Sequence, residues 1–568
     1  MVVMGNPPYS VSSTNIIKEG SEFHKFYESY KELVRKEERN IQPLSDDYIK
    51  FIAFAHWKIK QAGKGIIGMI TNNSYLDGLI HRDMRRKLLE DFNEIYILNL
   101  HGSTKRQEKT PDGGKDENVF DIQQGVSIIL LLKNESSMKS IKYTDVWGLR
   151  EEKYDYLEKN DISSTRWESV KPHEPHNFFT IKDFGGIKLY DRFVPLEKIF
   201  RQFNAGVATG KDDLFVSLDK DDLVRRLSIA EKSLFDISMQ SYKIPQLLAN
   251  RLFEELKGLE IRNSVVSYSY RPFDTRYVIY NKRILQRARD VIMGSFLKPN
   301  LGLISLKGIR KQSLGYFFVS DNVTDRHILD ISADTAYVFP LYIYNNSVQQ
   351  ELLEDIHKSN NFQWGNLGWF ETLQAFTSVL SGNFIQPTEA IFYYIYAILY
   401  SNVYRQKYQE FLKIDFPGIP FTKDYELFKN LAELGEQLVQ FHLLNSSELE
   451  NPLVKYDGSG DNVVKKREYI TFSKPKVQSG PNLPKPPFRK TGSTWINDSQ
   501  FFYTIDPEVW DYKIGGYQVL DKWLKDRIGR TLSAEDIKHY CKMATALTKT
   551  ITIQKQIDEL YPKVEETL

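Results

Sequence analysis

The stretch Gly5-Asn6-Pro7-Pro8-Tyr9 follows the short apolar run Met1–Met4 and organises the first part of this 568-residue chain. An apolar run that stops at two prolines predicts a strand ending in a stiff loop, because proline fixes φ and removes a backbone donor. Pro7 also favours an extended conformation at Asn6. The loop therefore presents one amide, Asn6, and one aromatic ring, Tyr9. The simpler alternative is a turn with Tyr9 packed in a core.

The tetrapeptide Asn6 to Tyr9 resembles the catalytic motif of amino-methyltransferases, and most of all that of the adenine-N6 DNA enzymes. The resemblance implies that Asn6, Pro7, Pro8 and Tyr9 are catalytic. An exocyclic purine amine is a poor nucleophile. The side-chain oxygen of Asn6 and the carbonyl of Pro7 would accept its hydrogen bonds as positive charge develops. Tyr9 would stack on a base flipped out of the duplex, which is worth about 1–3 kcal/mol.

Strand-like and helical patterns alternate after this loop. The strand-like runs are 65–70, 94–100 and 126–132, and the helical patterns are 48–61 and 82–92. The run 65–70 is continuously apolar, as in a strand buried on both faces. The alternation predicts an α/β fold for residues 1–134, half of a doubly wound, Rossmann-like methyltransferase sheet. Asn6–Tyr9 and the polar loop 71–74 would lie at the carboxyl ends of its strands.

Three further segments complete the predicted organisation. The charged loop 104–117 holds a proline and two adjacent glycines, and is predicted to be a mobile surface loop near the cleft. Residues 135–190 are polar and broken by Pro172 and Pro175, which predicts a connecting segment. Residues 191–568 are predicted to form a mixed α+β region with C-terminal helices.

Composition excludes several classes of protein. There are 76 Lys and Arg residues against 74 Asp and Glu, so the formal charge is +2 and any nucleic-acid footprint must be local. The single Cys541 excludes a disulfide framework and fits a reducing cytoplasm. No apolar run reaches the roughly 18 residues typical of a membrane span. His173 and His176 have no cysteine near them, so no metal site is predicted.

Basic residues cluster after residue 268. Arg271-Pro272-Phe273-Asp274 places an arginine beside a rigid proline and an aromatic ring, which suits a fixed contact with a phosphate or a guanine edge. The alternative is a buried Arg271–Asp274 pair that shapes the fold. The basic run Lys282 to Arg289 is either a DNA contact or a solvated face. The residues predicted to bind DNA are Arg271, Asp274, Arg276, Arg283, Arg287 and Arg289.

Later segments extend the resemblance over nearly the whole chain. Residues 270–274, 391–399, 404–408 and 510–519, together with Asn6 to Tyr9, are similar to the C-terminal region of Type ISP restriction–modification enzymes and their single-chain Type IIG relatives. The family implies an adenine-N6 DNA methyltransferase domain over 1–134 and a DNA target-recognition region over 191–568. It also implies S-adenosylmethionine as cofactor, double-stranded DNA as partner, and a cytoplasmic location.

One departure from the family pattern is large. The family's cofactor motif, a Phe-x-Gly-x-Gly loop, precedes Asn-Pro-Pro-Tyr by many tens of residues, but almost nothing precedes it here and no such loop follows. We therefore expect the C-terminal part of a larger enzyme, with an incomplete S-adenosylmethionine pocket whose residues are unknown. A partner or upstream polypeptide would supply the cofactor motif, nuclease and translocase. The isolated chain is expected to be inactive.

Two other functions stay open. The chain could be a non-catalytic DNA-specificity subunit that acts with a partner holding the cofactor motif, for which residues 191–568 would suffice. It could also methylate a protein glutamine or ribosomal RNA, because those families carry Asn-Pro-Pro-Tyr as well. They are compact, however, and lack a recognition region of nearly four hundred residues.

Overall fold

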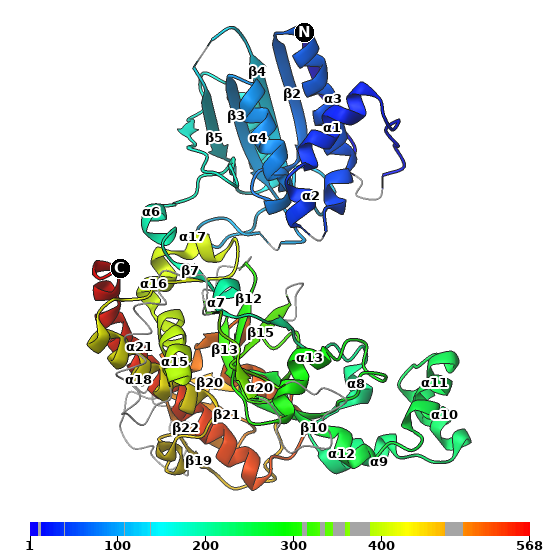
Figure 1. Ribbon diagram of the computed structural model, residues 1–568, viewed down its shortest axis with the longest axis vertical. Coiled ribbons are helices and arrows are strands. Elements are labelled where there is room, and N and C mark those ends of the chain that lie inside the picture. Colours follow the sequence, from blue (N-terminus) through cyan, green and yellow to red (C-terminus); the bar gives the residue numbers. More distant parts are fainter. Residues whose placement is uncertain are drawn as a thin grey trace. The chain divides into compact units, whose positions relative to one another are not determined.

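The computed structural model describes residues 1–9, 13–38, 40–106, 108–136, 138–308, 315–329, 335–344, 358–363, 387–471 and 492–568. They form two compact units, Met1–Asp183 and Phe184–Leu568 (Figure 1). Each unit has a hydrophobic core of its own. In these ranges no helix combines the length and the apolar character needed to cross a membrane.

Unit 1 is built around a six-stranded sheet with the order β1-β2-β4-β3-β5-β6. The strands are β1 (Val2–Gly5), β2 (Gly65–Asn72), β3 (Glu94–His101), β4 (Val126–Lys133), β5 (Ser140–Asp145) and β6 (Glu168–Ser169). β1 is parallel to β2, and β3 is parallel to β5. β4 lies between β2 and β3 and is antiparallel to both. The predicted α/β alternation is present, in a mixed sheet.

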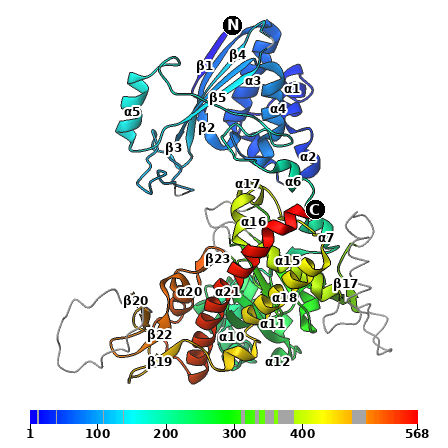
Figure 2. The same ribbon diagram turned by 90° about the vertical axis from the view of Figure 1, so that its left-hand side faces the viewer.

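Helices cover the two faces of this sheet unequally. Figure 2 shows α1 (Glu22–Glu28), α3 (Asp47–Ala62) and α4 (Arg82–Asp91) on one side, and α5 (Arg150–Lys159) on the other.

The unequal cover decides which residues of β2 are buried. Ile67 and Met69 of β2 face the first side and are buried, whereas Ile66 is 41% exposed. The prediction that this strand is buried on both faces is therefore wrong. The reason is that α5 packs against Leu98 and Leu100 of β3 rather than over Ile66.

The sheet continues beyond residue 134. β5 and β6 lie within the segment 135–190, for which the sequence predicts a connection, and β5 pairs with β3 over its whole length. Unit 1 consequently extends to Asp183. A parallel strand cannot be recognised as a neighbour from local sequence, because its partner lies some forty residues away.

Unit 2 is a mixed α+β region. Its described residues include three four-stranded sheets, ordered β14-β10-β11-β9, β13-β12-β15-β8 and β19-β22-β21-β20. The strands of the first two are β8 (Asn204–Ala205), β9 (Val216–Ser217), β10 (Val265–Arg271), β11 (Asp274–Ile279), β12 (Gly302–Leu306), β13 (Phe317–Ser320), β14 (Val323–Thr324) and β15 (Ala336–Pro340). Those of the third are β19 (Lys455–Asp457), β20 (Glu468–Ile470), β21 (Gly492–Trp495) and β22 (Phe501–Ile505).

Three long helices pack together in unit 2: α15 (Pro387–Tyr400), α18 (Tyr425–His442) and α21 (Ala534–Glu566). α15 is apolar on all sides, and its residues from Ala390 to Tyr400 are buried in the core. The sequence predicts this burial, because a helix without a polar face must be enclosed.

Candidate functional site

The Asn6–Tyr9 loop lies at the carboxyl edge of the sheet in unit 1. β1 and β2 are parallel with Gly5 opposite Met69, so the loop and the end of β2 meet at one edge. Asn6 and Pro8 are exposed, whereas Pro7 is buried. The buried proline fixes the loop to the body of the unit, and the amide of Asn6 remains open to a substrate.

Tyr9 is half buried beside this edge. Its ring meets Tyr48 of α3 edge to face, with ring centroids 6.2 Å apart, and its hydroxyl donates a long hydrogen bond of 3.5 Å to the carbonyl of Ile70. Burial, with a smaller contribution from Asp46, raises the pKa of Tyr9 to about 12. The core packs against Tyr9 without enclosing it, so its stacking on a base stays a prediction.

A chain of polar side chains joins the strand ends at this edge. Asn73 donates to Asn99 Oδ1 at 3.0 Å, and Asn99 donates to the hydroxyl of Tyr143 at 2.9 Å. The Tyr143 hydroxyl donates to Asp145, whose Oδ1 also lies 2.6 Å from His101 Nε2. The network ties together the ends of β2, β3 and β5. Sequence reasoning missed it, although polar residues at the end of the apolar strand 94–101 were a signal.

His101 is the most constrained residue of this network. Its φ of 51° is in the left-handed region, which costs free energy for a residue with a Cβ atom. The ring stacks on Trp147 with centroids 3.3 Å apart. Burial acts to lower the pKa of His101, but hydrogen bonds to Asp145 and Glu108 outweigh it, so the pKa is raised. The network therefore favours the imidazolium form at this edge.

Unit 2 holds the residues predicted to contact DNA. Two of them are buried, and a third, Arg276, is partly buried with its side chain 16% exposed. Arg271 is 5% exposed, with Nη1 2.8 Å from Asp325 Oδ1. Asp274 is 3% exposed and accepts from Arg276 at 2.7 Å and Arg527 at 2.9 Å. Arg271 and Asp274 are thus buried and paired, but with other partners than each other. These contacts favour a structural role, and DNA contact by the three residues stays untested.

The other three lie in the basic run after β11. The side chain of Arg283 is 72% exposed, with Glu255 3.6 Å away. Arg287 is exposed, and Arg289 has a left-handed φ of 58°. These positions suit a surface contact better than the β10–β11 hairpin does.

The short segment Gly206-Val207-Ala208 lies beside Arg287. Ala208 and Arg287 exchange main-chain hydrogen bonds of 3.1 and 3.0 Å, and Val207 bonds to the main chain of Thr324 and Arg326. The fold therefore brings Arg287 and Arg326 to either side of one short segment. The position of Arg326 near Arg287 could not be predicted from the sequence, because the two residues are 39 positions apart along the chain.

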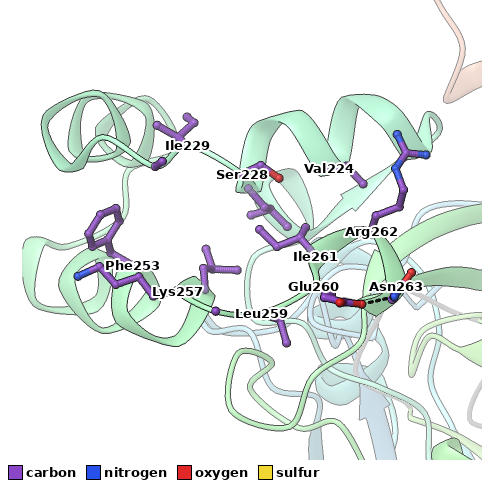
Figure 3. Close-up of a pocket in the computed structure, with 14 residues that line it drawn as sticks. Val224, Ser228, Ile229, Phe253, Lys257, Leu259, Glu260, Ile261, Arg262 and Asn263 are labelled. Atoms are coloured by element: carbon purple, nitrogen blue, oxygen red, sulfur yellow. Dashed lines mark hydrogen bonds between the residues drawn. The ribbon is translucent and has the colours of Figure 1, made fainter.

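Unit 2 also contains an open groove of about 600 Å³ (Figure 3). It lies between the helical hairpin of α10 (Lys232–Ser241) and α11 (Gln246–Leu256) and the body of the unit. Its lining includes the apolar side chains of Leu227, Ile229 and Leu256 and the charged residues Lys257 and Glu260. It holds no residue predicted to act on a substrate. Within the described ranges no three metal-ligating side chains come together.

Two family models match the chain. The Type ISP C-terminal specificity domain matches residues 198–556, more than half of the chain, and the Eco57I restriction-modification methylase matches residues 1–105. The chain therefore belongs to the Type ISP restriction–modification family, with a methylase region followed by a specificity region. No curated protein sequence matches the chain significantly.

Three solved structures share the fold over 98% of this chain. They are the ATP-dependent Type ISP restriction-modification enzyme LlaBIII bound to DNA (TM-score 0.67, 22% identity), a nuclease-deletion mutant of the Type ISP enzyme LlaGI in complex with a DNA substrate mimic (0.63, 21%) and the DrdV–DNA complex (0.67, 20%). This chain covers 37%, 52% and 56% of their lengths, respectively. The family resemblance predicted from Asn6–Tyr9 and the later segments is confirmed.

Proposed function

We propose that this chain is the portion of a restriction–modification enzyme that recognises a DNA site and methylates adenine in it at N6, with S-adenosylmethionine as the methyl donor. The observation that carries the methylating role is the exposed Asn6, held in a rigid loop at the carboxyl edge of the sheet. The sheet resembles the C-terminal half of a Rossmann-like methyltransferase. The choice of adenine rests on the Asn-Pro-Pro-Tyr motif.

In this proposal the chain binds and orients the flipped base. The side-chain oxygen of Asn6 and the carbonyl of Pro7 accept hydrogen bonds from the adenine amine. Two fixed acceptors favour the tetrahedral nitrogen, and they act most strongly as positive charge develops on it. Tyr9 offers a ring for stacking, which offsets part of the cost of flipping.

The residues of this chain do not by themselves fit S-adenosylmethionine. The sequence holds no Phe-x-Gly-x-Gly loop, so no step is assigned here through the cofactor. β1 is an edge strand among the described residues, with Val2 67% and Met4 81% exposed. An open strand edge with apolar side chains is a surface suited to pairing with another segment. We propose that a partner portion pairs with β1 and completes the pocket.

Unit 2 is proposed to read double-stranded DNA. The support is the specificity-domain match and the shared fold with enzymes whose structures were solved with DNA. Arg283, Arg287 and Arg289 are the proposed contacts, since two of them are exposed and none is buried. Arg271, Asp274 and Arg276 are paired with other residues of unit 2, so the role proposed for them is to stabilise its fold.

The second candidate is a non-catalytic specificity subunit. It is favoured by the size of the specificity region, which covers 198–556. The two candidates agree on DNA binding and differ on whether Asn6 takes part in a reaction.

Methyl transfer tests the proposal. The chain is combined with the cofactor-binding portion of a Type ISP enzyme, and labelled S-adenosylmethionine is supplied with duplex DNA, RNA and protein. Label in DNA supports the proposal. DNA binding without any transfer supports the specificity subunit, and label in RNA or protein contradicts both.

A further inference from the structure

A basic turn lies just after β3, in the loop 104–117 that the proposed chemistry does not use. Lys105, Arg106 and Lys109 are exposed. Arg106 is 49% exposed at its side chain and reaches Asp77 only at 3.8 Å. In the part of the chain that the structure describes, no carboxylate lies within ion-pair distance of Lys105 or Lys109. Among the described residues, Lys105 and Lys109 are therefore exposed cations without a paired carboxylate.

Contacts at both ends tie the loop 104–117 to unit 1, and its predicted mobility stays a prediction. The Ser103 main-chain N–H donates to Glu108 Oε2 at 2.8 Å, and that of Arg106 donates to Ser103 Oγ at 3.2 Å. At the far end, Asp116 and Lys153 form a fully buried ion pair of 2.7 Å. The contacts of Ser103 with Arg106 and Glu108 fix the start of the turn next to the end of β3.

The turn lies at the same edge of the sheet as the Asn6–Tyr9 loop. Arg106 approaches Asp77, which closely follows the short helix η3 (Asn73–Tyr75) at the end of β2. The ring of Tyr75 lies 6.2 Å from Tyr48, and Tyr48 lies 6.2 Å from Tyr9. A few side chains therefore separate the basic turn from the ring proposed to stack on the target base.

Asp77 does not neutralise this edge. Lys182 also approaches Asp77, at 4.0 Å, so that one carboxylate serves two cations. Lys105, Arg106 and Lys109 thus add exposed positive charge at the sheet edge that also holds the Asn6–Tyr9 loop, in a chain whose total charge is close to zero. Local positive charge of this kind is what a phosphate backbone requires.

We infer that Lys105, Arg106 and Lys109 bind phosphates of the DNA strand that carries the target base, next to the base that is flipped. This inference rests on the proposed function. Phosphate contacts position a duplex without reading its sequence, and a flipped nucleotide needs its backbone held on both sides. The exposed cations next to the end of β3 would provide such a hold.

The salt dependence of DNA binding tests this inference. The full chain is titrated with a duplex selected from a random pool, at a series of salt concentrations. Log K falls as log salt rises, and the magnitude of this negative slope should become smaller by about 0.9 for each phosphate that a variant no longer neutralises. We compare Arg106→Ala and the double variant Lys105→Ala/Lys109→Ala with Lys64→Ala. Lys64 is a matched control, since it is 73% exposed and precedes β2 at the opposite edge of the sheet.

Three results are distinguishable. A smaller slope in the basic-turn variants, with the Lys64→Ala slope unchanged and thermal unfolding unchanged in all, supports the inference. Slopes equal to wild type in both basic-turn variants overturn the inference and leave the proposed function standing. If the wild-type chain fails to bind duplex DNA, the proposed function fails and the inference falls with it.

A methylphosphonate scan then places the contact. Neutralising the phosphate that Arg106 contacts should remove the difference in affinity between wild type and Arg106→Ala, because the pair no longer interacts. That position should lie within one or two nucleotides of the methylated base. A position elsewhere, or no such position, would overturn the assignment to the target strand.

Discussion

At the scale of single residues, two substitutions of Tyr9 distinguish a role of its ring from a role of its hydroxyl group. Tyr9→Phe keeps the ring and removes only the 3.5 Å hydrogen bond to Ile70, so methylation by the completed enzyme should stay close to wild type. Tyr9→Ala removes a stacking contribution of about 1–3 kcal/mol, which predicts a rate about 5–150 times lower. The measurement is the rate of methyl transfer by wild type and by the two variants in the completed enzyme. Equal damage by both substitutions would mean that the hydroxyl carries the role.

Arg271 provides a second test at this scale. Arg271→Ala leaves Asp325 buried without its cation, and breaking a buried pair in this way costs about 3–5 kcal/mol. Denaturant unfolding should show this destabilisation, and Arg271→Lys, which keeps the charge, should be less destabilised. An Arg271→Ala variant with unchanged stability and weaker DNA binding would contradict the structural role and restore the predicted DNA contact.

Arg287 should behave in the opposite way. Its side chain is exposed, so Arg287→Ala should leave unfolding unchanged while it weakens DNA binding. If the contact is to a base edge, the binding free energy should weaken by about 1–3 kcal/mol, at one position of the site. Affinity measured on single-base variants of the duplex checks this. Unchanged affinity for every duplex would remove Arg287 from the interface.

At the scale of elements, local sequence patterns predict those features of the fold that depend on neighbouring residues. The all-apolar run of α15 predicts a buried helix, as observed. The Asn6–Tyr9 loop follows an apolar run, which predicts its place at a strand end. Each of these depends on residues only a few positions apart.

Contacts distant along the chain could not be predicted in this way. Arg271 pairs with Asp325, 54 residues later, and Asp274 pairs with Arg527, 253 residues later. The Asn73–Asn99 contact joins residues from the ends of β2 and β3, two strands that β4 separates in the sheet. The spacing of residues within a motif contains no information on partners that are distant along the chain. The nearest opposite charge in the sequence is therefore an unreliable prediction of the ion-pair partner.

His442 couples three helices and makes their packing sensitive to acid. Its ring nitrogens contact the Tyr396 hydroxyl of α15 at 2.6 Å and the Thr550 hydroxyl of α21 at 2.9 Å. Burial lowers the pKa of His442 to about 3, so folding keeps the ring neutral. The unfolded chain binds more protons between pH 3 and 6.5, and stability therefore falls as pH falls through this range. From pH 6.5 to 5 this group alone lowers the free energy of unfolding by about 2 kcal/mol.

Two variants isolate this effect in denaturant unfolding measured from pH 7 to 4. His442→Gln should show a shallower pH dependence than wild type. Thr550→Val removes one hydrogen-bond partner and keeps the imidazole, so it should lower stability at every pH and retain the wild-type slope. A His442→Gln variant with the full wild-type slope would contradict the account.

At the scale of the whole molecule, the chain holds a methylase region and a specificity region. The family's glycine-rich loop is not part of its sequence. We therefore expect the chain alone to bind S-adenosylmethionine without useful affinity, as measured by calorimetry. Binding should appear when the cofactor-binding portion of a relative is added. Micromolar binding by residues 1–568 alone would contradict the proposal that a partner completes the pocket.

The central claim is that the Asn6–Tyr9 loop binds an adenine whose N6 amine is methylated. The identity of the modified nucleoside tests this claim most directly. DNA treated with the completed enzyme is digested to nucleosides and analysed by mass spectrometry. Wild type should yield N6-methyladenine, and Asn6→Ala should yield it about 10²–10³ times more slowly with DNA affinity unchanged. Methylcytosine as the product, or a near-normal rate in Asn6→Ala, would contradict the claim.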